Sequence, residues 1–472
     1  MKNVITNIRN YFSGELESSE TCGANKGETA APNRFFAKTK QAAFVFGSVL
    51  SLFLFLSLTS LEAQAATFFV NTKDDAIDAN VGDGVCDTHT GLEPQCSLRA
   101  AIQEANFSLD IDDIMFSLDG SITLTLGWLP ITSSMNINGP GARTLAISPI
   151  AATHSGVFDI KHRPTGFVNI SGVTVSGANR NSGIIIRLGA GTVNLTEVAV
   201  KDNTAEGNGG GIANYGGTLN LVRSTVSNNL ALNGGGIYND LSGVTNIINS
   251  TICDNRAVNR GGGGGNFDLS GGGGIANYAG EMTLVNATVS YNVSSSQGGG
   301  IALLLQTTRI RNTIVAMNQV VEDKAANGPD VYGWVDSKGN NLIGSSFGNS
   351  GFINGVGGDQ VGTDEAYLYP VQGILRNNGG QTDTIALHLG STALNAGNSC
   401  VVQAPLCLAE ALITDQRGML RKYGKSVDIG AFESKTLGTT DPVSIGGKIS
   451  LPNNRVLRNA PTIMTSAIKI FD

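Results

Sequence analysis

The sequence predicts an all-β chain that coils into a parallel β-helix, and three observations lead to this fold class. Six similar segments recur, each alternates apolar and polar residues rich in Val, Ile and Thr, and glycine runs fall between them. Such alternation is typical of strands, and a helical repeat would not tolerate a glycine run in every unit. A fixed period in the twenties indicates a solenoid. The segments begin at Phe167, Thr192, Thr218, Val244, Glu281 and Thr307, and the glycine runs end at Ile212, Ile237, Ile275 and Ile301.

The spacing of these segments predicts how each coil is built. Their starts lie 25, 26, 26, 37 and 26 residues apart, and the longest interval contains a glycine-rich insertion from Gly261 to Gly271. A unit of this length has room for two or three short strands and their turns. Stacked in parallel about 4.8 Å apart, the units would enclose one narrow core along the axis.

One column of asparagines follows the same period. Each member comes three residues after a Val or Ile that we expect to face the core, such as Val200 or Val226. A preference of asparagine for turns would explain any single position, whereas a stacked amide ladder explains five in register. We expect a structural ladder with no chemical role, formed by Asn203, Asn229, Asn255, Asn292 and Asn318.

Residues 1–65 are predicted to be a secretory signal peptide with a long basic start. The only long apolar run covers residues 42–61, with Arg34, Lys38 and Lys40 before it. The small-x-small sequence Ala63-Gln64-Ala65 follows as a cleavage site. The alternative is an uncleaved anchor helix, since about 20 apolar residues can span a bilayer. We expect an exported protein, extracellular or on the cell surface, with no membrane span after cleavage.

The cysteines fit an oxidising compartment. Cys86 and Cys96 are ten residues apart, and Cys400 and Cys407 are seven apart, which predicts two local disulfides. Cys253 is left over within a repeat segment. A metal site is the alternative, but the chain has no Cys-x-x-Cys, and its four histidines are scattered.

Residues 66–113 are predicted to cap the first coil, and residues 114–345 to form the β-helix. A short helix from Ser97 to Asn106 would cover the apolar end of the stack, with Ser97 as its N-cap. The loop before it is rich in aspartate and offers weak candidates for Ca²⁺ binding, although such loops are usually only solvated. These candidates are Asp74, Asp75, Asp78, Asp83 and Asp87; no other cofactor or metal is expected.

Several motifs resemble bacterial surface proteins. Cys96 to Ile102 reads CSLRAAI and resembles the CSLREAI motif, with Ala100 in place of its glutamate. The Gly-Gly-Gly-Ile and Val/Ile-x-x-Asn repeats are similar to those of polymorphic outer-membrane proteins. The resemblance implies a right-handed, pectin-lyase-like β-helix and export, but no particular activity. Four more motifs resemble the choice-of-anchor Q domain, namely Asn340 to Gly344, Asn377 to Thr382, Asp415 to Gly418 and Asp428 to Glu433.

The C-terminal third is predicted to leave the repeat. Residues 346–434 form the choice-of-anchor Q-like region, which we expect to close the far end of the stack. Residues 435–442 are predicted to be a linker. Residues 443–472 resemble the start of a carboxypeptidase-regulatory-like β-sandwich, and are too short to complete one, so we expect a truncated domain.

Charged residues give few candidates for catalysis. Asp202 and Asp254 share a column with Asn228 between them, so two coils separate them by about 9.6 Å, near the upper limit for an inverting pair of carboxylates. The same column later holds Tyr291 and Met317, which argues for a turn column. Both aspartates are therefore only weak catalytic candidates.

These features favour a secreted or cell-surface binding protein, adhesin-like, whose ligand is a glycan or a protein surface. The net charge of −7 and the absence of a basic run argue against nucleic acid. The alternative is an extracellular polysaccharide lyase or glycoside hydrolase on a β-helix. Aromatic side chains near the glycine turns could stack on sugars, and these are Tyr215, Tyr238, Tyr278 and Phe267.

Overall fold

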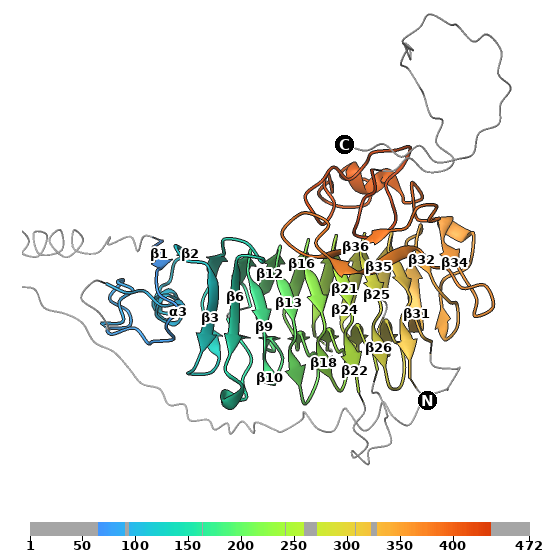
Figure 1. Ribbon diagram of the computed structural model, residues 1–472. Coiled ribbons are helices and arrows are strands. Elements are labelled where there is room, and N and C mark those ends of the chain that lie inside the picture. Colours follow the sequence, from blue (N-terminus) through green and yellow to red (C-terminus); the bar gives the residue numbers. More distant parts are fainter. Residues whose placement is uncertain are drawn as a thin grey trace, which may run out of the picture. The chain divides into compact units, whose positions relative to one another are not determined.

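The computed structural model describes residues 65–89, 94–162, 164–240, 242–258, 271–306, 308–321 and 328–435. These residues form an all-β parallel β-solenoid, as the repeat predicts (Figure 1). The predicted leader up to residue 64, most of the glycine insertion with Phe267, most of the linker and residues 443–472 lie outside the described residues.

Each regular coil consists of four short strands joined by tight turns. In one coil these are β15 (Ile212–Asn214), β16 (Thr218–Val222), β17 (Thr225–Ser227) and β18 (Leu230–Ala231). Each strand pairs in parallel with the equivalent strand of the next coil, as Leu219 does with Thr245. The sequence predicted two or three strands per unit, because a strand of two residues is too short to show an alternation.

Equivalent strands of successive coils form four parallel sheets along the stack, numbered here 1 to 4. Sheet 1 contains β16 and its equivalents, and sheet 3 contains β15 and its equivalents. They meet at β31 (Val331–Ser337), which pairs with both, and β33 (Asn349–Ser350) pairs with β31. Sheet 1 comprises β1 (Thr67–Val70), β2 (Asp112–Phe116), β5 (Met135–Asn138), β8 (Phe167–Ser171), β12 (Thr192–Thr196), β16, β20 (Val244–Ile248), β24 (Glu281–Val285) and β28 (Thr308–Arg311). Sheet 3 comprises β4 (Leu129–Ile131), β7 (Phe158–Ile160), β11 (Ile184–Ile186), β15, β19 (Ile237–Asn239), β23 (Ile275–Asn277) and β27 (Ile301–Leu303).

Sheets 2 and 4 complete the outline of the coils. Sheet 2 comprises β3 (Gly120–Leu124), β6 (Leu145–Pro149), β9 (Thr174–Ser176), β13 (Ala199–Lys201), β17, β21 (Thr251–Cys253), β25 (Thr288–Ser290), β29 (Ile314–Ala316), β32 (Leu342–Ile343) and β34 (Gln360–Val361). Sheet 4 comprises β10 (Asn179–Arg180), β14 (Thr204–Ala205), β18, β22 (Arg256–Ala257), β26 (Val293–Ser294) and β30 (Gln319–Val320). Two 3₁₀ turns, η2 (Ala151–Thr153) and η4 (Val356–Gly358), lie between strands.

The core is a set of apolar columns that run along the axis of the stack. Val200, Val226, Ile252 and Val289 stand in register on sheet 2 and are fully buried. Leucine, isoleucine and valine side chains of sheets 1 and 3 meet them, so the inward positions of the strands form one continuous cluster. Burial of this apolar surface supplies the main driving force for stacking.

Helix α3 (Leu98–Phe107) covers the first coil, as the sequence predicts. It packs against β1, β2 and β4, and its buried residues include Leu98, Ala101 and Ile102. Ser97 is the N-cap, and its hydroxyl accepts a hydrogen bond from the Ala100 amide at 3.0 Å. No helix among the described residues is long and apolar enough to cross a membrane.

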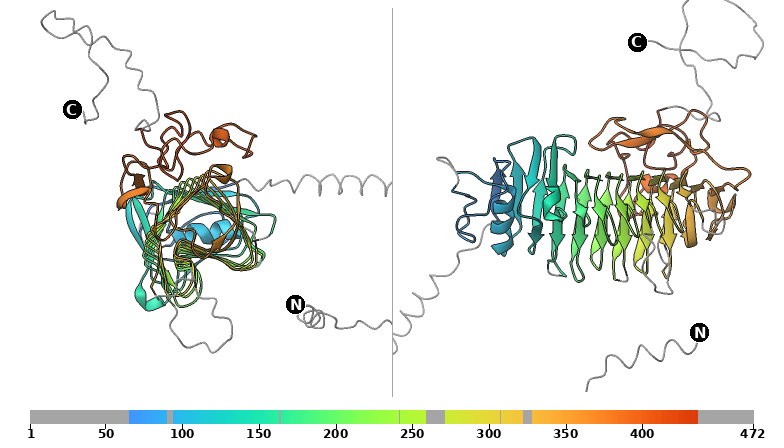
Figure 2. Two further views of the ribbon diagram at one scale, coloured as in Figure 1. Left: turned by 90° about the vertical axis from the view of Figure 1, so that its right-hand side faces the viewer. Right: turned by 60° about the horizontal axis from the view of Figure 1, so that its bottom comes forward.

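The C-terminal region, residues 363–435, packs on the outer face of sheet 2 and not on the far end of the stack (Figures 1 and 2). It contains an antiparallel hairpin of β35 (Val371–Arg376) and β36 (Thr384–Leu387), and the 3₁₀ turn η5 (Ser399–Val402). The region predicted to close the far end, residues 346–434, divides in two. Its first part stacks on the last coil, where β34 pairs with β32 and where Phe352 and Val361 join the core. Residues 363–435 instead pack on sheet 2, because the outer face of that sheet is itself apolar there. Cys253, Ile314 and Ala316 face outward and pack against Ile385 and Ile429.

Candidate ligand-binding groove

The choice-of-anchor Q-like motifs fasten the C-terminal region to the solenoid. The amide of Gln416 donates to the Ser224 carbonyl at 3.1 Å and to the Thr225 hydroxyl at 2.9 Å. Its oxygen accepts from the Thr251 hydroxyl at 2.6 Å. One side chain therefore bridges two consecutive coils. In the motif Asp428 to Glu433, the backbone amide of Ala431 donates to the Thr288 hydroxyl at 3.0 Å, which extends the contact by one more coil.

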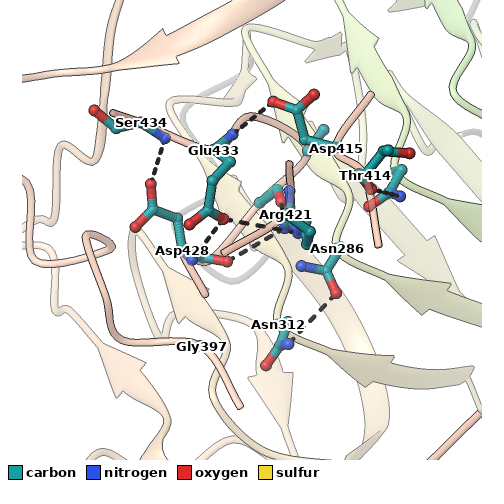
Figure 3. A network of polar contacts seen from close by, with 12 residues as sticks. Asn286, Asn312, Gly397, Thr414, Asp415, Arg421, Asp428, Glu433 and Ser434 are labelled. Carbon is teal, nitrogen blue, oxygen red and sulfur yellow. Dashed lines mark hydrogen bonds and ion pairs between the residues drawn. The ribbon is translucent and has the colours of Figure 1, made fainter. Parts of the chain in front are cut away.

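Buried charges hold these motifs together (Figure 3). Arg421 has no exposed surface; its guanidinium donates to the Gly430 carbonyl and lies 3.9 Å from a carboxylate oxygen of Glu433. Burial raises the pKa of Glu433 to about 8, although the charge of Arg421 opposes this rise. Asp415 accepts from the backbone amide of Glu433 at 3.0 Å. Because these groups are buried and point at one another, they serve as internal structure.

The C-terminal region covers only part of sheet 2, and a groove lies where the cover ends. Its floor is formed by β6, β9, β13 and β17, and one wall by residues 375 and 381–383. The volume is about 500 Å³, which is typical of ligand sites. The polar part of the lining consists of six hydroxyl residues, four charged side chains and one amide, and apolar residues such as Leu145 and Leu375 complete it. The polar residues are Thr144, Thr174, Ser176, Thr225, Ser227 and Thr382, then Arg143, Lys201, Asp202, Asp383 and Gln381.

The charged side chains of the groove form two ion pairs. Arg143 on the floor lies 2.7 Å from the Asp383 carboxylate of the wall, and its Nε donates to the Gly380 carbonyl at 3.2 Å. Lys201 lies 3.8 Å from Asp202, and both side chains are about half exposed. Each carboxylate therefore has a cation beside it, and all four groups can reach a ligand in the groove.

The structure places Asp202 and Asp254 in a turn column and brings only Asp202 into the groove. Both have positive φ, 57° and 56°, as do Asn228, Tyr291 and Met317 of the same column. Asn228 donates to Asp202 at 2.5 Å, so an amide separates the two carboxylates. Asp254 is exposed and accepts from the buried Cys253 thiol, whose pKa is raised by burial. The positive φ explains why short polar residues begin this column.

The aspartate loop brings together a different set of carboxylates from the five candidates. Only Asp78 and Asp83 approach one another, and Glu104 of α3 joins them, with one ligand atom of each within 4.8 Å of the others. Asp75 instead pairs with Arg99 at 2.6 Å, Asp87 pairs with His89, and Asp74 is exposed. Burial raises the pKa of Glu104, and its oxygens accept from the Gly82 and Gly84 amides. The three carboxylates would suit Ca²⁺ chemically.

The predicted disulfide cysteines and the column of asparagines stabilise the fold and do not line the groove. Disulfides join Cys86 to Cys96 and Cys400 to Cys407, and Cys253 is a buried free thiol. The five asparagines form a buried ladder in which each side-chain amide donates to the next carbonyl oxygen at 2.9 to 3.0 Å. The last donor, Asn318, bonds to the carboxylate of Asp330 at 3.0 Å. Nothing in the repeat pattern predicts this acceptor, because Asp330 lies 12 residues after Asn318 and so falls outside the 26-residue spacing of the column.

The aromatic candidates lie away from the groove. Tyr215 and Tyr238 pack against each other with ring centroids 5.9 Å apart, and Tyr238 is only 8 % exposed. Both tyrosines have raised pKa values because of burial. Tyr278 follows β23 on the same side of the coils. These rings are therefore largely packed into the surface of sheet 3 and offer little face for stacking.

Arg143 and Asp383 shape the groove but were not predicted from the sequence, whereas Gln381 belongs to the motif Asn377 to Thr382. Arg143 and Asp383 are 240 residues apart, and only the docking of the C-terminal region joins them. One signal was present: the motif Asn377 to Thr382 directly precedes Asp383.

A comparison with solved structures finds a pectate lyase, Pel9A, at 10 % sequence identity and a TM-score of 0.35, over 78 % of this chain and 96 % of that one. No protein-family model matches the sequence, and no curated protein does. The resemblance to the CSLREAI and choice-of-anchor Q families stays a prediction from their motifs.

Proposed function

We propose that this protein is exported and binds a polysaccharide chain in the groove beside its C-terminal region. The observation that carries the proposal is the lining of the groove, in which six hydroxyl side chains, an amide and two ion pairs lie beside a few apolar side chains such as Leu145 and Leu375. Sugar rings present a dense set of hydroxyls that both donate and accept hydrogen bonds. Arg143 and Lys201 would also attract the carboxylates of an acidic polysaccharide.

Export is supported by the disulfides of the described chain and by the sequence that precedes it. Two disulfides suit an oxidising compartment, and the apolar run with Ala63-Gln64-Ala65 fits a cleaved leader. On this basis the stiff solenoid is displayed outside the cell or released from it.

The positions of the carboxyl groups with strongly raised pKa values favour binding over cleavage. A glycosidase needs a carboxylic acid of raised pKa within reach of the sugar bond. Two strongly raised carboxyl pKa values belong to Asp330 and Glu433, which are buried inside the protein. Within the groove, Lys201 and Asp202 lie side by side, and this pair is what favours the alternative, a lyase or hydrolase.

A binding screen of the purified chain against pectin, alginate, xylan, cellulose and chitin tests the proposal. Lys201→Ala should weaken binding to the captured polysaccharide about tenfold, because a hydrogen bond from a charged group is lost. The matched control is Lys161→Ala, an exposed lysine just beyond β7 that does not line the groove. Equal binding by both variants, or capture of none of the polysaccharides, would contradict the proposal.

The same material decides between binding and cleavage. New reducing ends or unsaturated ends are measured after incubation with each polysaccharide. The double variant Asp202→Asn with Asp254→Asn should fold and should lose only part of the parent's binding, because Asp202 lines the groove but Arg143, Lys201 and Gln381 stay in place. If the parent releases oligosaccharides and the double variant does not, the enzyme alternative is correct.

A further inference from the structure

The backbone amide of Ala66 has an unusual acceptor. It donates to Oδ1 of Asp112 at 2.7 Å, and the Asp113 amide donates back to the Ala66 carbonyl at 2.9 Å. Asp112 begins β2, which pairs with β1 from Thr67 onward. Ala66 is therefore held at the start of the first strand pair, one residue after Ala65 of the small-x-small sequence.

Asp112 is a carboxylate that lacks a cation. Its side chain is 1 % exposed, and its Oδ2 has no hydrogen-bond partner. Burial raises its pKa, the negative charges of Asp110 and Asp113 act in the same direction, and the Ala66 amide and the Ser108 hydroxyl oppose them. No Lys, Arg or His side chain in the described part of the chain forms an ion pair with it. Burying a carboxylate without a cation costs free energy, so a cation placed next to Asp112 would stabilise the folded state.

We propose that hydrolysis of the Ala65–Ala66 peptide bond creates an α-ammonium group that pairs with Asp112 and locks the first coil. The proposal rests on the export part of the proposed function. A leader peptidase would add water across the amide: the hydroxyl group goes to the carbonyl carbon of Ala65, and the nitrogen of Ala66 leaves as an amine and takes up a proton.

The pairing follows from the geometry already present. The nitrogen of Ala66 lies within hydrogen-bond distance of Oδ1, and cleavage changes it from one N–H donor to three. One of the additional donors can serve Oδ2, which has no hydrogen-bond partner. Processing therefore turns an unfavourable acidic site into a neutralised one, and it does so only when the chain begins at Ala66.

A protein with a soluble carrier in place of residues 1–64 allows a direct test. The described residues all belong to one compact unit, so both versions keep that unit whole. A protease site placed directly before Ala66 frees the α-amino group there, and a second version frees it before Ala65, which moves it by one residue, about 3.5 Å. The α-amino pKa is measured by NMR after isotopic methylation of the amine. In the chain that begins at Ala66 it should lie at least about 1 above the ordinary 7.7–8.0.

Asp112→Asn provides the matched variant, and Asp119→Asn, an exposed position, controls for the loss of one charge. Asp112→Asn should return the α-amino pKa to its ordinary value and lower the melting temperature of the chain that begins at Ala66. In the chain that keeps Ala65 it should leave both quantities unchanged or raise the melting temperature. An ordinary α-amino pKa in the Ala66 chain that does not respond to Asp112→Asn would overturn the proposal. N-terminal sequencing of exported protein tests the cleavage point separately, so a failure of export is distinguishable from a failure of the lock.

Discussion

Asp330 ends the buried asparagine ladder on a carboxylate, and this single residue sets the direction of the whole column. Both the backbone amide and the side-chain amide of Asn318 donate to its Oδ1, and the Ser345 amide donates to its Oδ2 at 2.8 Å. Tyr367 adds a hydroxyl donor. Because a carboxylate only accepts, every amide in the ladder must orient its nitrogen toward this end.

The charge of Asp330 predicts a pH-dependent contribution to stability. Burial raises its pKa from 3.8 to about 6, although the donors around it oppose this rise. The folded state thus holds the proton more tightly than the unfolded state. The contribution is fully present below about pH 4 and is lost as pH rises through about 6, and the difference corresponds to about 3 kcal/mol. The difference in melting temperature between parent and Asp330→Asn should therefore narrow, or reverse, from pH 4 to pH 7.

Asp336→Asn is the control for this comparison, since Asp336 is partly exposed and pairs with Lys338 at 2.7 Å. A difference between parent and Asp330→Asn that stays constant across this pH range would show that Asp330 keeps one protonation state in the folded protein.

At the scale of the strand, the inward positions were predictable from the sequence and the outward ones were not. Val226 and Ile252 follow a local period, so their burial is visible in the alternation itself. Thr225 reads as an outward, solvent-facing residue by the same alternation, yet it is 2 % exposed. Its hydroxyl donates to the Asp383 carbonyl at 2.6 Å, a contact across 158 residues that no local pattern records. The groove depends on such contacts, which is why its residues were missed.

Two threonines on the outer face of sheet 2 test whether the C-terminal region covers β17. Thr225 lies beneath the C-terminal region, whereas Thr123 of β3 is exposed beyond it. Thr225→Asp should destabilise the fold by several kcal/mol, because a charge would be buried among partners arranged for a hydroxyl. Thr123→Asp should change the free energy of unfolding by no more than about 0.5 kcal/mol.

Chemical denaturation of the two variants and of Val226→Asp supplies the measurement. Val226→Asp introduces a charge into the core between coils and should be at least as damaging as Thr225→Asp. If Thr225→Asp proved as mild as Thr123→Asp, the C-terminal region would not be seated on β17 in solution.

In the whole molecule, the C-terminal region sets the position of the groove on sheet 2. The solenoid offers one long face in sheet 2, and the motifs with Gln416 and Ala431 fix the cover over its later coils. The earlier coils stay open, and the boundary supplies the groove with its wall. A second column of asparagines, on sheet 1, has the opposite direction: Asn194 donates to Asn169, Asn169 to Asn136, and Asn136 to the carboxylate of Asp113 at 2.8 Å. A carboxylate therefore ends this column near the first coil.

The last prediction concerns Gln416, because it joins the two parts through one amide. Gln416→Ala removes its hydrogen bonds to Ser224, Thr225, Thr251 and Thr382 and leaves buried partners without replacement, at about 1–3 kcal/mol for each unsatisfied group. The loss should fall on the docking of the C-terminal region, since the core columns of the coils do not involve this residue. Hydrogen exchange measured by mass spectrometry should therefore speed up in residues 371–433 while β8, β12 and β16 keep their protection. Gln403→Ala, which replaces an exposed glutamine of the same region, should change the exchange rates of neither part.

Polysaccharide binding by Gln416→Ala should weaken as the wall of the groove loosens, because the floor of the groove alone lacks Gln381 and Asp383. Equal acceleration in the coils and in the C-terminal region would instead mean that the two parts unfold as one cooperative unit.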